Sequence, residues 1–119
     1  MKTTLVIGAS TNADRYSYKC IKLLQEHKIR TYAIGNKEGT INQVKIETGF
    51  PHYTDINTVA VYLSAKNQEI YYDYLISLKP QRILFPPGTE NHEFEIKARA
   101  NGIITEQACP LVMLNVGTY

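Results

Sequence analysis

The chain has 119 residues, with an apolar share of 44% and a charged share of 20%, which are ordinary values for one globular domain. Its 13 basic and 11 acidic residues are spread along the sequence and argue against a nucleic-acid-binding surface. No apolar run approaches the roughly 20 residues that span a bilayer, and the two cysteines match no disulfide or metal spacing. We therefore expect one domain over residues 1–119, located in the reducing cytoplasm, with no nucleic-acid or membrane partner.

The first third of the chain predicts a strand, a helix and a second strand. Residues 4–7 form a short apolar run that ends at Gly8, which is typical of a strand buried on both faces. Apolar residues at helical spacing predict a helix over 15–28 that packs one face on a sheet. Residues 31–34 predict the second strand, which ends at Gly35.

The middle of the chain begins with its least regular stretch, residues 36–57. We expect a short hairpin over 40–46, and Pro51 excludes a helix there. Residues 58–63 predict a third strand, and apolar residues at helical spacing predict a helix over 70–78.

The last third predicts a fourth strand over 82–85 and a helix that is capped by Thr89 and ends at Asn101. A fifth strand follows over 103–105. We expect that the short apolar segment 111–114 could pair at a sheet edge or in a dimer.

Buried strands separated by helices predict parallel pairing, and right-handed crossovers place helices on both faces. We therefore predict an α/β fold with a doubly wound, mostly parallel, Rossmann-like sheet in three layers. Ligands bind such sheets beyond the carboxyl ends of the strands. This rule selects the loops that follow Ile7, Ile34, Leu63 and Phe85.

The first of these loops, residues 8–17, suits a phosphate group. Gly8 permits a sharp turn and a close approach to an anion, the following helix presents free N–H groups, and Arg15 adds a cation. Tyr16 and Tyr18 are the tyrosines that this order places beside the loop for stacking. Helix capping alone explains the loop equally well, because a full G-x-G-x-x-G pattern is absent. Side-chain donors are present at Ser10, Thr11, Asn12 and Ser17.

The second loop, Gly35-Asn36-Lys37, indicates which nucleotide would bind. A NAD site usually carries an acidic residue near the end of the second strand, where this chain has an amide and a cation. Lys37 suits a phosphate on the ribose, as in CoA or NADP, and disfavours NAD. The alternative is a solvated turn lysine.

The third and fourth loops give weaker signals. The third loop, Ser64-Ala65-Lys66-Asn67, could contact an adenine or a diphosphate; the alternative for Asn67 is that it only caps the next helix. Pro86-Pro87-Gly88 would form a stiff apolar wall beside a pantetheine arm or an adenine, and Asn91 follows it at the start of a helix.

Few residues are placed for acid–base chemistry. His92 is the one histidine on the ligand side of the sheet, and Cys109 lies near the end of the last strand, but a surface role and an inert thiol are the favoured interpretations. The acidic residues form no recognisable pair, and no metal-ligand cluster is present. The sequence therefore favours a binding module over an enzyme.

Five short segments carry a resemblance to a known family. They are Val6-Ile7-Gly8-Ala9-Ser10, Arg15-x-Ser17, Ile34-Gly35-Asn36-Lys37, Pro86-Pro87-Gly88 and Cys109-Pro110. In this order they resemble the small stand-alone CoA-binding proteins, which are related to the N-terminal domain of the succinyl-CoA synthetase alpha subunit. The chain departs from that pattern after the second strand, where the usual Asn-Pro is missing, and after the fourth, where the usual glutamine is missing.

The resemblance covers essentially the whole chain and implies a domain that binds CoA or an acyl-CoA across the strand ends. The first loop would hold the diphosphate and the second the adenosine end; ligase activity is not implied. The expected cofactor-binding residues are Gly8, Ala9, Ser10, Thr11, Asn12, Arg15, Ser17, Tyr18, Gly35, Asn36, Lys37, Ser64, Pro86, Pro87, Gly88 and Asn91.

Three hypotheses of function remain open from the sequence. The first is a non-catalytic or regulatory module for CoA, with a homodimer or an acyl-CoA enzyme as the candidate protein partner. The second is an NADP-dependent oxidoreductase or its cofactor-binding subunit, which would need a substrate pocket that 119 residues hardly provide. The third is an interaction module whose nucleotide site is not used.

Overall fold

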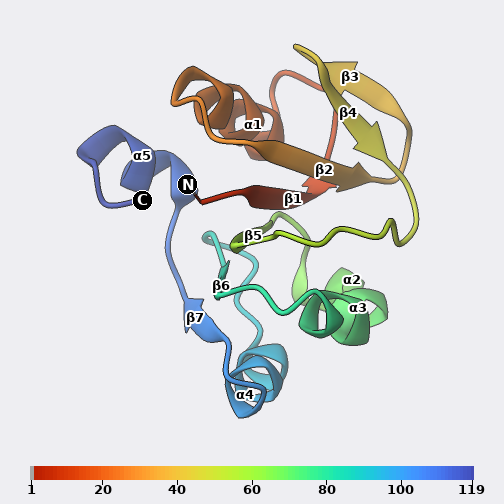
Figure 1. The fold of residues 1–119 in the computed structure, drawn as a ribbon, viewed down its shortest axis with the longest axis vertical. Helices are drawn as coiled ribbons and strands as arrows, with labels where there is room; N and C mark the ends of the chain where they lie inside the picture. Colours follow the sequence, from red (N-terminus) through yellow and green to blue (C-terminus); the bar gives the residue numbers. More distant parts are fainter. Residues whose placement is uncertain (1) are drawn as a thin grey trace.

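A seven-stranded sheet runs through residues 2–119, the part of the chain that the computed structural model describes (Figure 1). The strand order is β3-β4-β2-β1-β5-β6-β7. All neighbours pair in parallel except the β3–β4 hairpin. The strands are β1 (Thr4–Ala9), β2 (Thr31–Gly35), β3 (Gly39–Ile41), β4 (Val44–Glu47), β5 (Thr58–Val61), β6 (Arg82–Leu84) and β7 (Ile104–Glu106).

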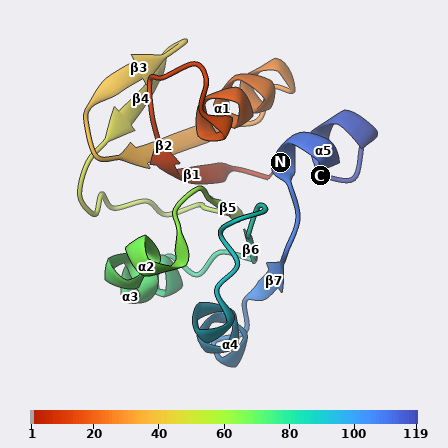
Figure 2. The ribbon, with the colours of Figure 1, turned by 180° about the vertical axis from the view of Figure 1, so that it is seen from behind.

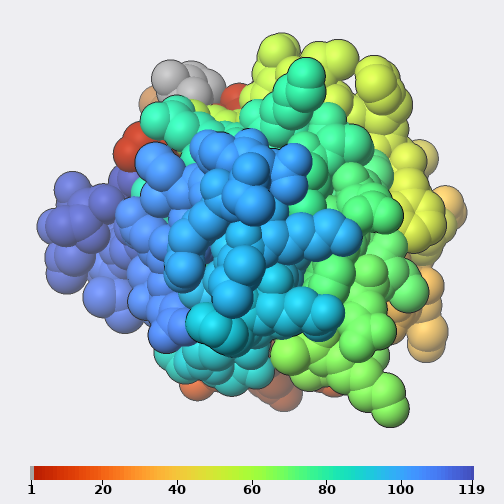
Figure 3. Space-filling model, turned by 90° about the horizontal axis from the view of Figure 1, so that it is seen from below, coloured from red at the N-terminus to blue at the C-terminus, as the bar shows by residue number. Residues whose placement is uncertain are grey.

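Helices cover both faces of this sheet (Figures 1 and 2). One face carries α1 (Tyr16–Glu26) and α5 (Pro110–Val116), which we call the α1 layer. The other carries the α3 layer, which consists of α2 (Ala65–Gln68), the 3₁₀ turn η1 (Glu69–Tyr71), α3 (Tyr72–Ser77) and α4 (His92–Ala100). Figure 3 shows α4 and the segment from α2 to α3 side by side on the outside of this second layer. The predicted three-layer α/β fold is confirmed.

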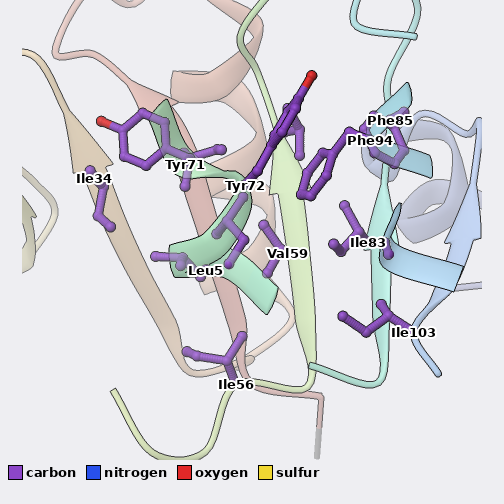
Figure 4. Packing of buried hydrophobic residues seen from close by; sticks show 14 residues of the cluster. Leu5, Ile34, Ile56, Val59, Tyr71, Tyr72, Ile83, Phe85, Phe94 and Ile103 are labelled. Atoms are coloured by element: carbon purple, nitrogen blue, oxygen red, sulfur yellow. The ribbon is translucent and has the colours of Figure 1, made fainter. Parts of the chain in front are cut away.

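The two sides of the core follow from the alternation of side chains along β1. Leu5 and Ile7 point to the α3 layer, whereas Val6 points to the α1 layer, and all three are fully buried. On the α3 side, the ring of Tyr72 stacks on that of Phe94 at 4.5 Å between centroids (Figure 4). Each fully buried large apolar side chain contributes about 1.5–3 kcal/mol, so both layers are held by burial against this strand.

The register of the central strands brings their carboxyl ends to one edge of the sheet. Thr4 of β1 lies opposite both Thr31 of β2 and Thr58 of β5. The chain leaves β1 toward β2 on one side and later returns to β5 on the other. The strand order therefore reverses at β1, which is where doubly wound sheets bind ligands.

Two of the predicted helices differ in the structure. The helix expected over 70–78 begins at Ala65 and is interrupted by η1. The N-cap expected at Thr89 is wrong, because Asn91 caps α4 by accepting a hydrogen bond from the N–H of Phe94 at 3.1 Å. The hydroxyl of Thr89 instead donates to the carbonyl of Pro86 at 2.7 Å and closes the preceding turn.

The expected hairpin over 40–46 is confirmed as β3 and β4. The expectation that 111–114 could pair at a sheet edge is wrong, because this segment lies within α5 and packs against α1. Pro110 stands in the first turn of α5, where its fixed φ favours a helix and its missing N–H costs no hydrogen bond.

The two cysteines should differ sharply in reactivity. Cys20 is fully buried in the α1 layer, and burial raises the pKa of its thiol to about 12, whereas Cys109 is half-buried. We expect an aromatic disulfide reagent at pH 8 to modify one thiol per native chain and two after unfolding in guanidinium. A Cys109→Ser variant should lose the fast reaction; rapid modification of both thiols in the native protein would contradict this packing.

Candidate functional site

A cavity of about 640 Å³ opens at the carboxyl ends of β1, β2 and β5, where the strand order reverses. Three of the four loops selected from the sequence meet there. The lining residues are Gly8, Ala9, Ser10, Thr11, Arg15, Gly35, Asn36, Lys37, Glu38, Tyr62, Leu63, Ser64, Asn67 and Tyr71.

The three loops touch one another through backbone at two glycines. Gly8 has a φ of +82°, and a Cβ there would lie 2.2 Å from the carbonyl oxygen of Tyr62. A Cβ on Gly35 would lie 2.3 Å from the carbonyl oxygen of Ala9. Because neither position has room for a side chain, the backbones of the loops after β1, β2 and β5 pack directly against one another beside the cavity.

The loop after β1 is ordered by its own polar side chains. The Ser10 hydroxyl accepts the N–H of Asn12, and the Asn12 amide oxygen accepts the N–H of Asp14, both at 3.0 Å. Arg15 is the extended N-cap residue of α1, and no side chain caps this helix. The first-turn N–H groups are therefore left for water or for an anion, toward which the positive end of the helix dipole is directed.

The charged groups of the cavity are Arg15, Lys37 and Glu38, all of which are exposed. Within residues 2–119 the ion pairs lie elsewhere, on α4, so both cations are available to a ligand. Glu38 is not among the residues expected from the sequence, although it directly follows Lys37. It is an acidic residue of the kind that binds ribose hydroxyls, so the turn after β2 offers both signs of charge.

Several expected residues of the first loop lie outside the cavity lining. The side chain of Ser17 is buried on α1, and Tyr18 packs against the core of the α1 layer. Asn12 is exposed and serves the loop itself through its bond to Asp14. Tyr16 is 67% exposed and lies beneath the ammonium group of Lys19, so neither tyrosine chosen for stacking from the sequence lines the cavity.

The expected residues of the fourth loop, Pro86-Pro87-Gly88 and Asn91, also lie outside the lining. The amide of Asn91 is buried and donates to Gln68 Oε1 at 3.0 Å and to the Tyr72 hydroxyl at 2.7 Å. Gln68 in turn donates to the carbonyls of Leu63 at 2.9 Å and Thr89 at 2.8 Å. These bonds tie the loop after β5 to the turn after β6.

The structure adds five residues to the expected set: Glu38, Tyr62, Leu63, Asn67 and Tyr71. Tyr62 and Leu63 were assigned to the third strand, but β5 ends at Val61, which places both in the loop. Tyr71 was assigned to a regular helix, and the 3₁₀ turn that brings it to the cavity leaves no clear mark in the sequence.

The cavity lining offers few groups for acid–base chemistry. Burial raises the pKa of Tyr62 far above its ordinary value, and the lining contains no histidine or cysteine. His92 is exposed on α4, and Cys109 caps α5; neither lines the cavity. Over residues 2–119, no group of three or more His, Cys, Asp or Glu side chains could hold a metal ion. The helices described in this range are all too short or too polar to cross a membrane.

Alanine substitutions at glycine should separate steric clash from backbone strain. Gly49 also has a positive φ, +77°, but has open space around it, so Gly49→Ala should cost only the strain, about 1–2 kcal/mol. Gly35→Ala should cost about 1–3 kcal/mol through the clash with Ala9. Gly8→Ala combines both effects, and we expect a loss of about 2–5 kcal/mol in urea unfolding. A Gly8→Ala variant no less stable than Gly49→Ala would refute the close backbone contact.

Comparison with known proteins identifies a family and similar structures for this chain. The family model described as a CoA binding domain matches residues 2–115. No curated protein was found to match the sequence. A crystal structure of an uncharacterized protein is similar over 100% of this chain and 98% of its own, with a TM-score of 0.97 and 39% identity.

Two more distant structures share the fold. A hypothetical protein from Pyrococcus horikoshii OT3 has a TM-score of 0.87 and 22% identity over 97% of this chain and 82% of its own. The dinucleotide forming acetyl-coenzyme A synthetase 1 of Ca. Korarchaeum cryptofilum has a TM-score of 0.72 and 13% identity over 87% of this chain and 25% of its own. With the family model matching nearly the whole sequence, the chain belongs to the CoA-binding domain family.

Proposed function

We propose that this protein binds coenzyme A or an acyl-CoA in the cavity at the ends of β1, β2 and β5, as a module without a reaction of its own. One observation carries the proposal: the turn at Gly8, the hydroxyl groups of the loop that leads into α1, and two cations outside the ion pairs, Arg15 and Lys37, line a single cavity. Each of these features suits phosphate.

The diphosphate would lie against the loop after β1. Because Gly8 has no side chain, the backbone there can approach the diphosphate closely. Ser10 and Thr11 offer hydroxyl groups, and Arg15 can form two parallel charged hydrogen bonds. Lys37 would contact the phosphate on the ribose, which its compact ammonium group can bind as a single point charge. Ser64 stands across the cavity and offers a further donor.

The pantetheine arm would leave the cavity along the strand ends. A volume of about 640 Å³ lies within the range of small-molecule sites. The next turn along the strand ends is Pro86-Pro87-Gly88. The hydrogen bonds of Gln68 and Asn91 connect this turn to the loop after β5. This turn offers an apolar surface with few donors, which suits the arm and an attached acyl group.

The lack of histidine and cysteine in the lining supports a binding role. A general base works best with a pKa near the operating pH, and burial moves the pKa of Tyr62 far above that range. A module of this kind would act through a partner, either an enzyme that uses acyl-CoA or a second copy of the chain.

A second candidate function is an NADP- or NAD-dependent oxidoreductase subunit. Glu38 favours it, because an acidic residue near the end of the second strand is the usual ligand of the ribose hydroxyls in NAD sites. The two functions differ in ligand preference and can be separated by titration.

Isothermal titration of the protein with CoA, dephospho-CoA, NADP and NAD should show CoA binding most tightly, because CoA alone among the four carries both the diphosphate and a 3′-phosphate on the ribose. Arg15→Ala and Lys37→Ala should each lose about 1–3 kcal/mol of binding free energy for CoA. Lys37→Ala should affect dephospho-CoA less.

Lys97→Ala is the matched control. Lys97 is an exposed cation on α4 that pairs with Asp73 at 3.1 Å and does not line the cavity. Tight NADP binding without heat from CoA would support the oxidoreductase instead. No heat from any of the four ligands would point to an interaction module.

A further inference from the structure

We infer that Tyr71 and Asn67 form the seat for the adenine ring of the nucleotide, on the side of the cavity that faces the α3 layer. The inference rests on the proposed function only in that the ligand is an adenine nucleotide. It assigns the base to two residues that come from neither of the first two loops.

Tyr71 is the aromatic side chain that links the core of the α3 layer to the cavity. It belongs to the buried cluster of that layer and also lines the cavity. Figure 4 shows its ring beside Ile34 of β2, with the hydroxyl at the outer end. The next residue, Tyr72, turns away and stacks on Phe94. The change from 3₁₀ turn to α-helix between the two thus aims only the first tyrosine at the strand ends.

The ring of Tyr71 is held in place by two neighbouring aromatic rings. Phe50 and Tyr74 contact it at centroid distances of 5.4 and 6.4 Å, and the Tyr74 hydroxyl donates to the carbonyl of Pro51 at 2.5 Å. Because the ring is already fixed, a base that contacts it loses little side-chain entropy on binding. Phe50 remains 56% exposed, which adds apolar surface next to Tyr71.

Asn67 supplies the polar half of the seat. It lines the same cavity one turn before Tyr71, and its backbone N–H bonds to the carbonyl of Ser64 at 3.0 Å. Across residues 2–119 its side-chain amide makes no hydrogen bond. An amide presents a donor and an acceptor together, which matches the N6 and N7 edge of adenine.

The seat can be tested with the two halves of CoA, adenosine 3′,5′-bisphosphate and 4′-phosphopantetheine, measured directly or by competition against CoA. Tyr71→Leu keeps apolar bulk in the core and removes the ring. We expect it to weaken binding of CoA and of adenosine bisphosphate about tenfold, with 4′-phosphopantetheine unchanged. Tyr32→Leu is the control, since Tyr32 packs against the same cluster, contacts the tilted ring of Tyr53 at 4.6 Å between centroids and does not line the cavity.

Asn67→Ala gives an independent answer that does not disturb the core, because Asn67 is exposed. It should weaken adenosine bisphosphate about fivefold and leave 4′-phosphopantetheine unchanged. If wild-type protein binds CoA but Asn67→Ala and a folded Tyr71→Leu match Tyr32→Leu for adenosine bisphosphate, the seat is wrong and the proposed function stands. If wild-type protein binds neither CoA nor its halves, the proposed function itself fails.

Discussion

The site depends on the direct contact of backbone with backbone at the carboxyl ends of three strands. At Gly8 and Gly35 the space for a side chain is taken by the carbonyl groups of Tyr62 and Ala9. The loops after β1, β2 and β5 can therefore lie against one another, and each can expose its polar atoms to the same volume. Side chains at these two glycines would separate the loops before they changed any contact with a ligand.

Electrostatics then gives this volume its preference. The dipole of α1 contributes about 0.3–1 kcal/mol toward an anion, and each charged hydrogen bond about 1.5–3 kcal/mol, so Arg15 and Lys37 outweigh the helix. Glu38, next to Lys37 in the turn after β2, adds a negative charge to the same lining. A ligand that places phosphate at the cations and hydroxyl groups at the carboxylate uses both signs, as a phosphorylated ribose can.

The sequence predicts the scaffold better than the site. Apolar runs and glycine punctuation were sufficient for the three-layer fold, and the strand-end rule identified the loops at Gly8, Gly35 and Ser64. The sequence does not show that Asn91, after β6, is buried away from the cavity lining, because its hydrogen-bond network with Gln68 depends on packing that no local pattern encodes. Tyr71 was missed for the same reason: a 3₁₀ turn rotated it out of the expected helical face.

In the proposed site, the two layers of helices would divide the recognition of a nucleotide between them. The α1 layer would contribute Arg15 and the start of its helix, which suit phosphate and carry no information about the base. The α3 layer would contribute Tyr71 and Asn67, which suit a flat ring with paired polar atoms. Since the sheet fixes both layers to the same strand ends, a ligand must be long enough to reach from one to the other. Inorganic phosphate or a free base would satisfy only one layer, whereas an adenine nucleotide satisfies both.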